Sequence, residues 1–315
     1  MRSFNIVGTV AAAAAGVLFL GVQPADAGTL LSGYAQQNGE FGVTFHDGAS
    51  LAQTADHAAG QKPVGLAYGA GSYYVAGVGG PSNNITRYDM SGAFMDDLPF
   101  GPLLETGPLA FGAGTLFMAY ESELSFSFHV GSYSPDLGFG DSFEIDLPEM
   151  ATGLAFGDDS LFVSYGTHLA QYDLNGDLVD SFDFGIPQVG ALAYGDGMLY
   201  AAYSSGSSFG WAGFDPAMLF ATGTSNGPSV STPFAVNGLA FGDGGLFASF
   251  DHDLVKYDLD GNVVAVLDSG RHVNGPLAFV SATSAAPEPA AWALLILGFA
   301  TTGAALRSRR RPFAL

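Results

Sequence analysis

A short apolar phrase recurs along the chain, each time followed by a turn containing Gly or Asp and by a second apolar stretch. The five full copies read GLAYGAGSYYVAG, PLAFGAGTLFMAY, GLAFGDDSLFVSY, ALAYGDGMLYAAY and GLAFGDGGLFASF, and a truncated copy, PLAFVSA, begins at Pro276. The leucines of these phrases stand at 66, 109, 154, 192, 239 and 277, so the spacing varies from 38 to 47 residues. In the third copy, Leu154, Ala155 and Phe156 leave no polar face, which predicts a strand covered on both sides.

A second phrase follows three of these copies and predicts another strand pair. It reads ITRYDMSGAFMDDL, LAQYDLNGDLVDSF and LVKYDLDGNVVAVL. Asn175-Gly176, Asp260-Gly261 and Ser91-Gly92 mark hairpin turns, because both central residues of such a turn need positive φ. Four short strands per repeat of roughly 40 to 45 residues are typical of a β-propeller blade. A β-helix, the alternative repeat architecture, has shorter coils and lacks this four-strand order.

The number of phrases predicts the number of blades. Five complete units start at residues 65, 108, 153, 190 and 238, whereas the sixth has only its innermost strand, Leu277–Val280. Its missing strands are predicted in Glu40–Thr54, which contains an Asp47-Gly48 turn. The sequence therefore predicts an all-β, six-bladed propeller over residues 28–284, with its last blade closed by strands from both ends of the chain.

Composition and charge exclude several classes of protein. The chain has 315 residues, of which 48% are hydrophobic and 12% charged, so it is not a disordered acidic chain. It has no cysteine, and therefore no disulfide framework. Residues 28–284 hold 28 acidic and four basic residues, a net charge of −24, which repels nucleic acid and attracts cations.

Residues 1–27 have the layout of a secretory signal peptide. Arg2 precedes an apolar run that ends in Ala25-Asp26-Ala27, a small-residue site for cleavage by signal peptidase after Ala27. The chain is therefore expected to be exported. The alternative is a buried N-terminal helix.

Residues 285–315 predict a membrane anchor with a processing site. Ala290–Leu306 is a run of 17 residues without charge, about 25 Å long as a helix. Trp292 suits one membrane interface, and the extended segment Pro287-Glu288-Pro289 stands just before it. Basic residues at the other end favour the cytoplasm: Arg307, Arg309, Arg310 and Arg311.

The same segment, PEPAAWALLILGFATTGAALRSRRR, resembles a PEP-CTERM sorting domain of the PEPxxWA subtype. The likeness lies in Pro-Glu-Pro, Trp292-Ala293, the apolar helix with its glycine, and the arginine cluster. It implies an exosortase as partner, removal of the helix, and delivery to the envelope or exopolysaccharide matrix of a Gram-negative bacterium. A plain single-span anchor is the alternative.

Chemistry-bearing motifs are scarce. The sequence contains no nucleophile triad pattern, phosphate loop or HExxH. Its histidines stand singly, without metal-type spacing, and are expected in solvated loops: His46, His57, His129, His168, His252 and His272. No catalytic residue and no metal site are predicted from the residues alone.

One further resemblance bears on enzymatic activity and metal binding. VNGLAFGDGGLFASFD, from Val236 to Asp251, is similar to a phrase of six-bladed gluconolactonase-type propellers, and NNITRYD is similar to the end of an NHL repeat. In the lactonase family the Asn before that Gly is an axial calcium ligand. The resemblance implies this role for Asn237, with Asn274 one blade further on and Glu105 as a nearby carboxylate.

The sequence therefore supports two alternative functions. The first is an exported, non-enzymatic binding or structural module without a cofactor, in the envelope or exopolysaccharide matrix, with polysaccharide or another envelope protein as partner. The alternative is a secreted, calcium-dependent hydrolase or lyase of the lactonase-type propeller class.

The sorting hypothesis predicts the C-terminus of the mature protein. If an exosortase processes the chain, the mature form ends near Pro287–Pro289 and lacks the apolar helix. Mass spectrometry of the native envelope or matrix fraction measures this terminus. Recovery of a mature chain that still carries Trp292 through Leu315 would leave the plain anchor in place of the sorting signal.

Overall fold

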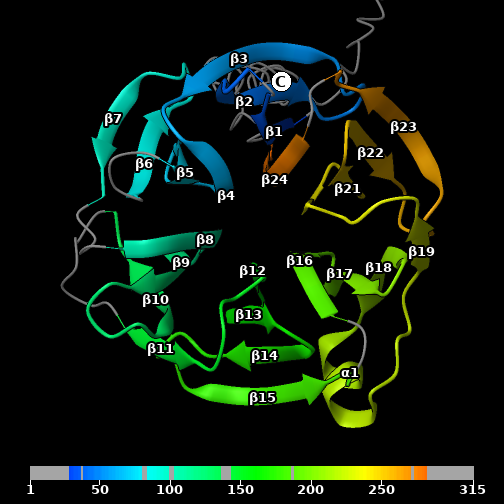
Figure 1. Cartoon of the computed structure of the whole chain (residues 1–315). Coiled ribbons are helices and arrows are strands. Elements are labelled where there is room, and N and C mark those ends of the chain that lie inside the picture. The colour runs from blue at the N-terminus through cyan, green and yellow to red at the C-terminus, as the bar shows by residue number, and fades with distance from the viewer. Residues whose placement is uncertain are drawn as a thin grey trace, which may run out of the picture.

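The computed structural model describes residues 28–36, 38–79, 84–98, 103–135, 143–185, 188–270 and 273–281. The described strands form six four-stranded antiparallel sheets arranged in a ring (Figure 1). The predicted six-bladed propeller is thus confirmed. The predicted signal peptide, with Ala25 and Ala27, and the predicted sorting segment 285–315 lie outside the described residues.

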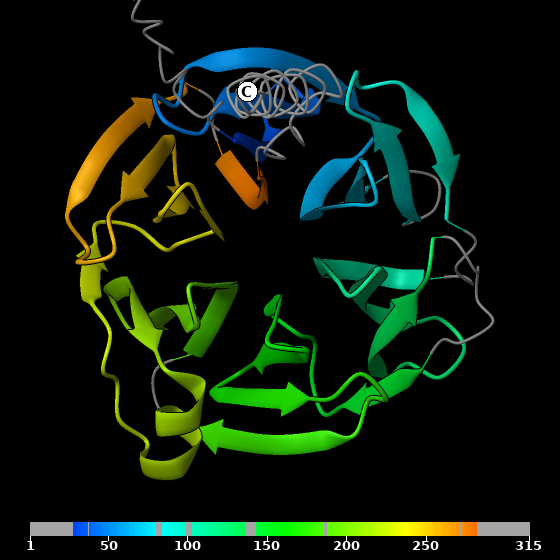
Figure 2. The same ribbon diagram turned by 180° about the vertical axis from the view of Figure 1, so that it is seen from behind.

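Five blades are each built from one continuous stretch of chain, with the first strand nearest the axis and the fourth at the rim (Figures 1 and 2). The first two are β4 (Lys62–Gly69), β5 (Ser72–Val78), β6 (Asn84–Asp89), β7 (Phe94–Asp97), and β8 (Leu103–Gly112), β9 (Thr115–Ser122), β10 (Phe128–Tyr133), β11 (Glu144–Leu147). The next two are β12 (Gly153–Gly157), β13 (Ser160–Tyr165), β14 (His168–Tyr172), β15 (Leu178–Asp183), and β16 (Gln188–Gly195), β17 (Met198–Ser205), β18 (Ser208–Phe214), β19 (Ser229–Thr232). The fifth is β20 (Gly238–Gly242), β21 (Gly245–Phe250), β22 (Asp253–Tyr257), β23 (Val263–Asp268).

The closing blade joins both ends of the described chain. Its innermost strand is β24 (Val273–Val280), followed outward by β1 (Thr29–Ala35), β2 (Phe41–Asp47) and β3 (Gln53–Ala59). The prediction of a shared blade is confirmed, but the predicted segment, residues 40–54, is too short. It misses β1, which pairs directly with β24, and most of β3.

One helix interrupts the repeat. The helix α1 (Pro216–Thr222), the only one among the described residues, lies between β18 and β19 at the rim and contacts β15 (Figure 1). Asp215 caps its first turn by accepting from the backbone N–H groups of Ala217 and Met218. This insertion accounts for the longest spacing between the repeated leucines. Within the described ranges, no helix has the length and apolar character needed to cross a bilayer.

Aromatic rings hold neighbouring blades together. At five of the six blade-to-blade interfaces, a ring on the second strand of one blade stacks on the ring of the next blade's Leu-Ala-Phe/Tyr phrase. The centroids are 5.4 to 5.9 Å apart and the planes are within 17° of parallel. The pairs are Tyr74 with Phe111, Phe117 with Phe156, Phe162 with Tyr194, Tyr200 with Phe241, and Phe247 with Phe279. At the sixth interface, Leu31 of β1 occupies the corresponding position, opposite Ala278, and belongs to the cluster on which Tyr68 packs.

The glycine after each full phrase makes room for these rings. A Cβ atom at Gly157 would lie only 1.8 Å from the ring of Tyr194, which belongs to the next blade. The same clash, at 1.8 to 2.0 Å, arises at the other phrase glycines, Gly69, Gly112, Gly195 and Gly242. The recurring sequence Leu-Ala-Phe/Tyr-Gly therefore encodes both an aromatic side chain and the space above a glycine into which the aromatic side chain of the next blade fits.

Two polar contacts fasten the closing blade to its neighbour. The buried Lys256 donates from Nζ to the backbone carbonyl of Gly48 at 2.8 Å, and its ammonium lies 5.1 Å from the centroid of the Phe247 ring. The backbone N–H of Gly28 donates to Asp243 Oδ2 at 2.9 Å. These contacts join residues 208 and 215 positions apart in the sequence, in a chain that has no cysteine for a disulfide.

Adding a methyl group at the blade interface should destabilise the propeller. We expect Gly157→Ala to lower the free energy of unfolding by about 2 to 3 kcal/mol, because the Tyr194 ring has to move away. Denaturant unfolding followed by circular dichroism measures the change. Gly60→Ala is the matched control, since a Cβ there meets no atom within 4 Å. Equal stability of the two variants would contradict this account of the interface.

Candidate binding site

The axis of the ring is lined mainly by apolar residues. One cavity on it, of about 70 Å³, is bordered by the six phrase leucines together with Thr152, Asn237 and the prolines Pro108 and Pro276. A shallow cavity of about 150 Å³ is lined by the leucine, alanine and Phe/Tyr positions of all six phrases. The described residues lining these cavities include no carboxylate, so the axis offers little to a charged ligand.

The three residues that the lactonase resemblance singles out are placed differently. Asn237 borders the axial cavity, and its backbone N–H donates to the carbonyl of Ser249 at 2.8 Å. Glu105 is an exposed residue of β8, opposite Glu121, and does not line the axial cavity. Asn274 lies in β24, opposite Tyr34, and its side chain is outside what the structure describes. A calcium role for this set stays a prediction.

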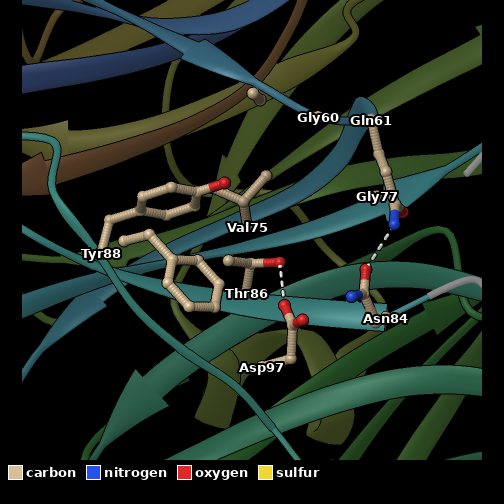
Figure 3. Close-up of a pocket in the computed structure, with 10 residues that line it drawn as sticks. Gly60, Gln61, Val75, Gly77, Asn84, Thr86, Tyr88 and Asp97 are labelled. Atoms are coloured by element: carbon tan, nitrogen blue, oxygen red, sulfur yellow. Dashed lines mark hydrogen bonds between the residues drawn. The ribbon is translucent and has the colours of Figure 1, made fainter.

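A larger pocket lies away from the axis, in the outer part of the blade β4–β7 beside the end of β3. We call it the side pocket (Figure 3). Its volume is about 280 Å³, large enough for one ring of a small ligand. Ten residues line it: Ala59, Gly60, Gln61, Val75, Gly77, Asn84, Thr86, Tyr88, Phe94 and Asp97.

Strand alternation brings the side-pocket residues to one face. Asn84, Thr86 and Tyr88 are alternate residues of β6 and therefore point the same way. On β5 their partners are Gly77, Val75 and Tyr73, and on β7 Thr86 faces Asp97 while Tyr88 faces Phe94. The face thus carries a polar end and an aromatic end, only a few residues apart.

Hydrogen bonds order the polar end. Gln61 Nε2 donates to Asn84 Oδ1 at 2.6 Å, and Thr86 Oγ1 donates to Asp97 Oδ1 at 2.7 Å (Figure 3). The Gln61 side chain passes over Gly77, where a Cβ would lie 2.6 Å from that of Gln61. The polar end therefore presents amide, hydroxyl and carboxylate groups that already hold one another in position.

Two rings form the aromatic end. Tyr88 stacks on the buried Tyr73 at 5.2 Å and meets Phe94 edge-on at 6.3 Å, with an interplanar angle of 83°. Burial, and secondarily the charge of Asp97, raise the pKa of the Tyr88 phenol, so it stays protonated at ordinary pH. Phe94 is 60% exposed, so its ring is accessible to a ligand in the pocket.

A second off-axis pocket, of about 260 Å³, lies between the blades β12–β15 and β16–β19. It is lined by polar residues such as Glu149, Gln188 and Ser204, and by a single aromatic residue, Tyr203. It lacks a pair of rings beside a hydrogen-bonding cluster. The side pocket is therefore the stronger candidate for ligand binding.

The sequence-based interpretation of the histidines is wrong for several of them. His46, His57, His129 and His168 lie in strands rather than loops. His46 and His129 are buried, and His46 is hydrogen-bonded to Ser32 Oγ and to the carbonyl of Leu51. His129 lies beside Glu144 and Asp146, a juxtaposition of adjacent strands that no sequence spacing revealed.

The sequence also did not predict the side pocket. The segment NNITRYD predicted a strand, but its pocket-lining residues could be recognised only from the positions of β5, β7 and the turn at Gly60-Gln61 around it. The available signal was weak. On β6, polar side chains occupy alternate positions, at Asn84, Thr86 and Tyr88. The equivalent strands β14 and β22 carry more apolar side chains.

Comparison with known proteins supports the fold alone. No protein-family model and no curated protein matches the sequence. Among solved structures, a protein of unknown function from Bacteroides caccae is 13% identical with a TM-score of 0.60, covering 81% of this chain and 99% of that one. A chain from a nidogen/laminin complex is 10% identical with a TM-score of 0.63, covering 80% of this chain and 98% of that one.

The axial geometry leads to a prediction about calcium. Calcium takes six to eight oxygen ligands, and the side chains described around the axial cavity include the oxygens of Asn237 and Thr152 but no carboxylate. We expect calorimetric titration to reveal no stoichiometric micromolar calcium site that Asn237→Ala removes, and a lactone panel to show no turnover. A micromolar site lost in Asn237→Ala together with lactone hydrolysis would instead support the enzymatic alternative.

Proposed function

We propose that the protein is an exported, non-enzymatic binding module of the cell envelope or exopolysaccharide matrix, and that its side pocket holds a sugar unit of a polysaccharide. The observation that carries the proposal is the side pocket itself, in which an exposed aromatic wall adjoins an ordered group of amide, hydroxyl and carboxylate side chains.

The chemistry of a sugar ring matches these two ends. A pyranose carries hydroxyls around its edge, which both donate and accept hydrogen bonds, and C–H groups on its faces. Asn84, Gln61 and Asp97 suit the hydroxyls, because amides and carboxylates offer donors and acceptors in fixed directions. Phe94 and Tyr88 suit the C–H faces, because aromatic rings bury apolar area at a low cost in side-chain entropy.

The negative charge in and around the pocket limits the kinds of sugar that we expect to bind. Asp97 lines the pocket, and residues 28–284 carry a net charge of −24. The adjacent Arg87 does not offset Asp97, since its guanidinium is engaged by Asp96 in a two-pronged ion pair at 2.8 and 2.9 Å. The proposal therefore favours neutral or amino sugars over uronic acids, which the acidic surface repels.

The ends of the chain supply the location in this proposal. Signal peptidase would remove residues 1–27, and an exosortase would act at Pro287-Glu288-Pro289. These steps would release residues 28–284 to the outer surface or the matrix. A propeller that carries one sugar-binding pocket at its rim is suited to attachment along a polysaccharide, because a long chain can pass across the open outer edge.

A glycan array followed by calorimetry with the best ligand tests the proposal. We expect binding to neutral or amino sugars, weakened at least tenfold in Phe94→Ala and in Asp97→Asn, since each variant removes one kind of contact. Phe234→Ala is the matched control, because Phe234 is also a large exposed aromatic residue, at 48% exposure, and does not line the side pocket.

Two outcomes would count against this function. If Phe234→Ala weakens binding as much as Phe94→Ala, the ligand does not occupy the side pocket. If the purified chain cleaves the glycans that it binds, releasing new reducing ends, the non-enzymatic interpretation is wrong.

A further inference from the structure

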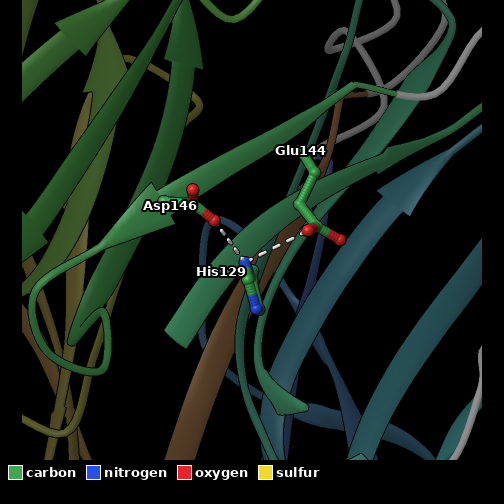
Figure 4. Close-up of side chains that lie close together, drawn as sticks. All are labelled: His129, Glu144 and Asp146. Carbon is green, nitrogen blue, oxygen red and sulfur yellow. Dashed lines mark ion pairs between the residues drawn. The ribbon is translucent and has the colours of Figure 1, made fainter. Parts of the chain in front are cut away.

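Three ionisable side chains converge on the outer half of the blade β8–β11, in a group that we call the His129 cluster (Figure 4). His129 on β10 stands directly opposite Asp146 on β11, and Gly131 stands opposite Glu144. Because Glu144 and Asp146 are two residues apart on a strand, both point to the same face, while Ile145 between them is buried on the other. The sheet register alone thus places two carboxylates beside one imidazole.

The distances within the cluster are short. His129 Nδ1 lies 2.9 Å from Asp146 Oδ1 and 3.2 Å from Glu144 Oε1. Two ligand atoms that bind one ion at about 2.1 Å and at right angles to each other are about 3.0 Å apart, and about 3.4 Å apart in tetrahedral geometry. The observed separations therefore match those of ligands that share a single small cation.

The state of His129 points to such a cation. The residue is only 6% exposed, and its Nδ1 atom lies at ion-pair distance from both carboxylates without making a geometrically acceptable hydrogen bond to any described group. A buried polar atom without a hydrogen bond costs free energy unless another partner satisfies it. An ion bound between Nδ1 and the two carboxylates would be that partner.

The surrounding hydrogen bonds orient the ligand atoms. Ser127 Oγ lies 2.7 Å from His129 Nε2, so that nitrogen can carry the ring proton and leave the lone pair of Nδ1 directed at the cluster. The Tyr120 hydroxyl donates to Glu144 Oε2, while the other oxygen of that carboxylate faces His129.

We propose that His129, Glu144 and Asp146 bind one divalent transition-metal ion of the Zn²⁺ class. A neutral imidazole with two carboxylates contributes two negative charges, which balance the ion. The nitrogen ligand favours Zn²⁺ over Ca²⁺ and Mg²⁺, which prefer oxygen ligands. The carboxylate side chains are 55% and 89% exposed, so water can complete the coordination from the solvent side. This site is separate from the side pocket and does not depend on the proposed function.

The neighbouring blade provides an internal control. His168 on β14 stands opposite Asp183 on β15, the same cross-strand pairing as His129 with Asp146. There the position corresponding to Glu144 is occupied by Ser181, and the His168 Nε2 to Asp183 Oδ2 distance is 3.6 Å. A His–Asp pair without the second carboxylate lacks the third ligand, so the proposal assigns no ion to it.

Calorimetric titration of the full chain with Zn²⁺, after treatment with a chelator, tests the site. We expect one equivalent to bind, an affinity at least tenfold lower in Asp146→Asn, and a larger loss in His129→Gln. His168→Gln, the same substitution at the control pair, should bind as the wild type does. Ca²⁺ and Mg²⁺ in tenfold excess should not displace the ion.

Asp146→Asn keeps the test decisive if His129→Gln does not fold, because Asp146 is exposed and the change preserves its shape. Circular dichroism checks each variant, and Co²⁺ in place of Zn²⁺ should give a visible absorption band in the wild type and not in Asp146→Asn. Absence of stoichiometric binding to the wild type would overturn the proposal. So would equal affinity in the wild type, Asp146→Asn and His168→Gln, which would mean that Zn²⁺ binds the acidic surface at large.

Discussion

The contact on which the ring depends is an aromatic side chain of one blade seated over a glycine of its neighbour. Tyr194 illustrates it, stacked on Phe162 and lying where a Cβ of Gly157 would otherwise be. A wedge-shaped blade cannot bury its inner strands alone, so each blade is stable only when another covers it. The recurring phrase supplies both halves of this contact, which is why it can be repeated around a ring.

The repeated aromatic contact is absent at the interface that closes the propeller. The last phrase has Val280 in place of the usual glycine, and β1 brings Leu31 rather than a ring to the final interface. On its other side the closing blade is fastened to the blade β20–β23 by bonds between distant parts of the chain, Lys256 to Gly48 and Gly28 to Asp243. Without cysteines, the ring is held shut by strand pairing, apolar burial and these buried polar contacts.

The same packing decides where ligands can bind. Rings of leucine, alanine and aromatic side chains line the axis, which leaves small cavities without described carboxylates. Polar and ionisable groups instead meet on the third and fourth strands, where neighbouring blades diverge. The side pocket and the His129 cluster both lie there, on different blades. A repeated scaffold with variable outer strands can in this way acquire separate sites without disturbing its inner contacts.

The sequence by itself determined the repeat, the four strands of a blade and the count of six, because strand burial and hairpin turns are encoded within a few neighbouring residues. It did not reveal β1, whose sequence TLLSGYA has neither the repeated phrase nor a tight turn. Nor did it reveal that Gln61 meets Asn84, or that His129 meets Glu144 and Asp146. Those contacts depend on strand register and on how blades sit against one another. Only tertiary structure decided them, because residues far apart in sequence become neighbours only after the chain has folded.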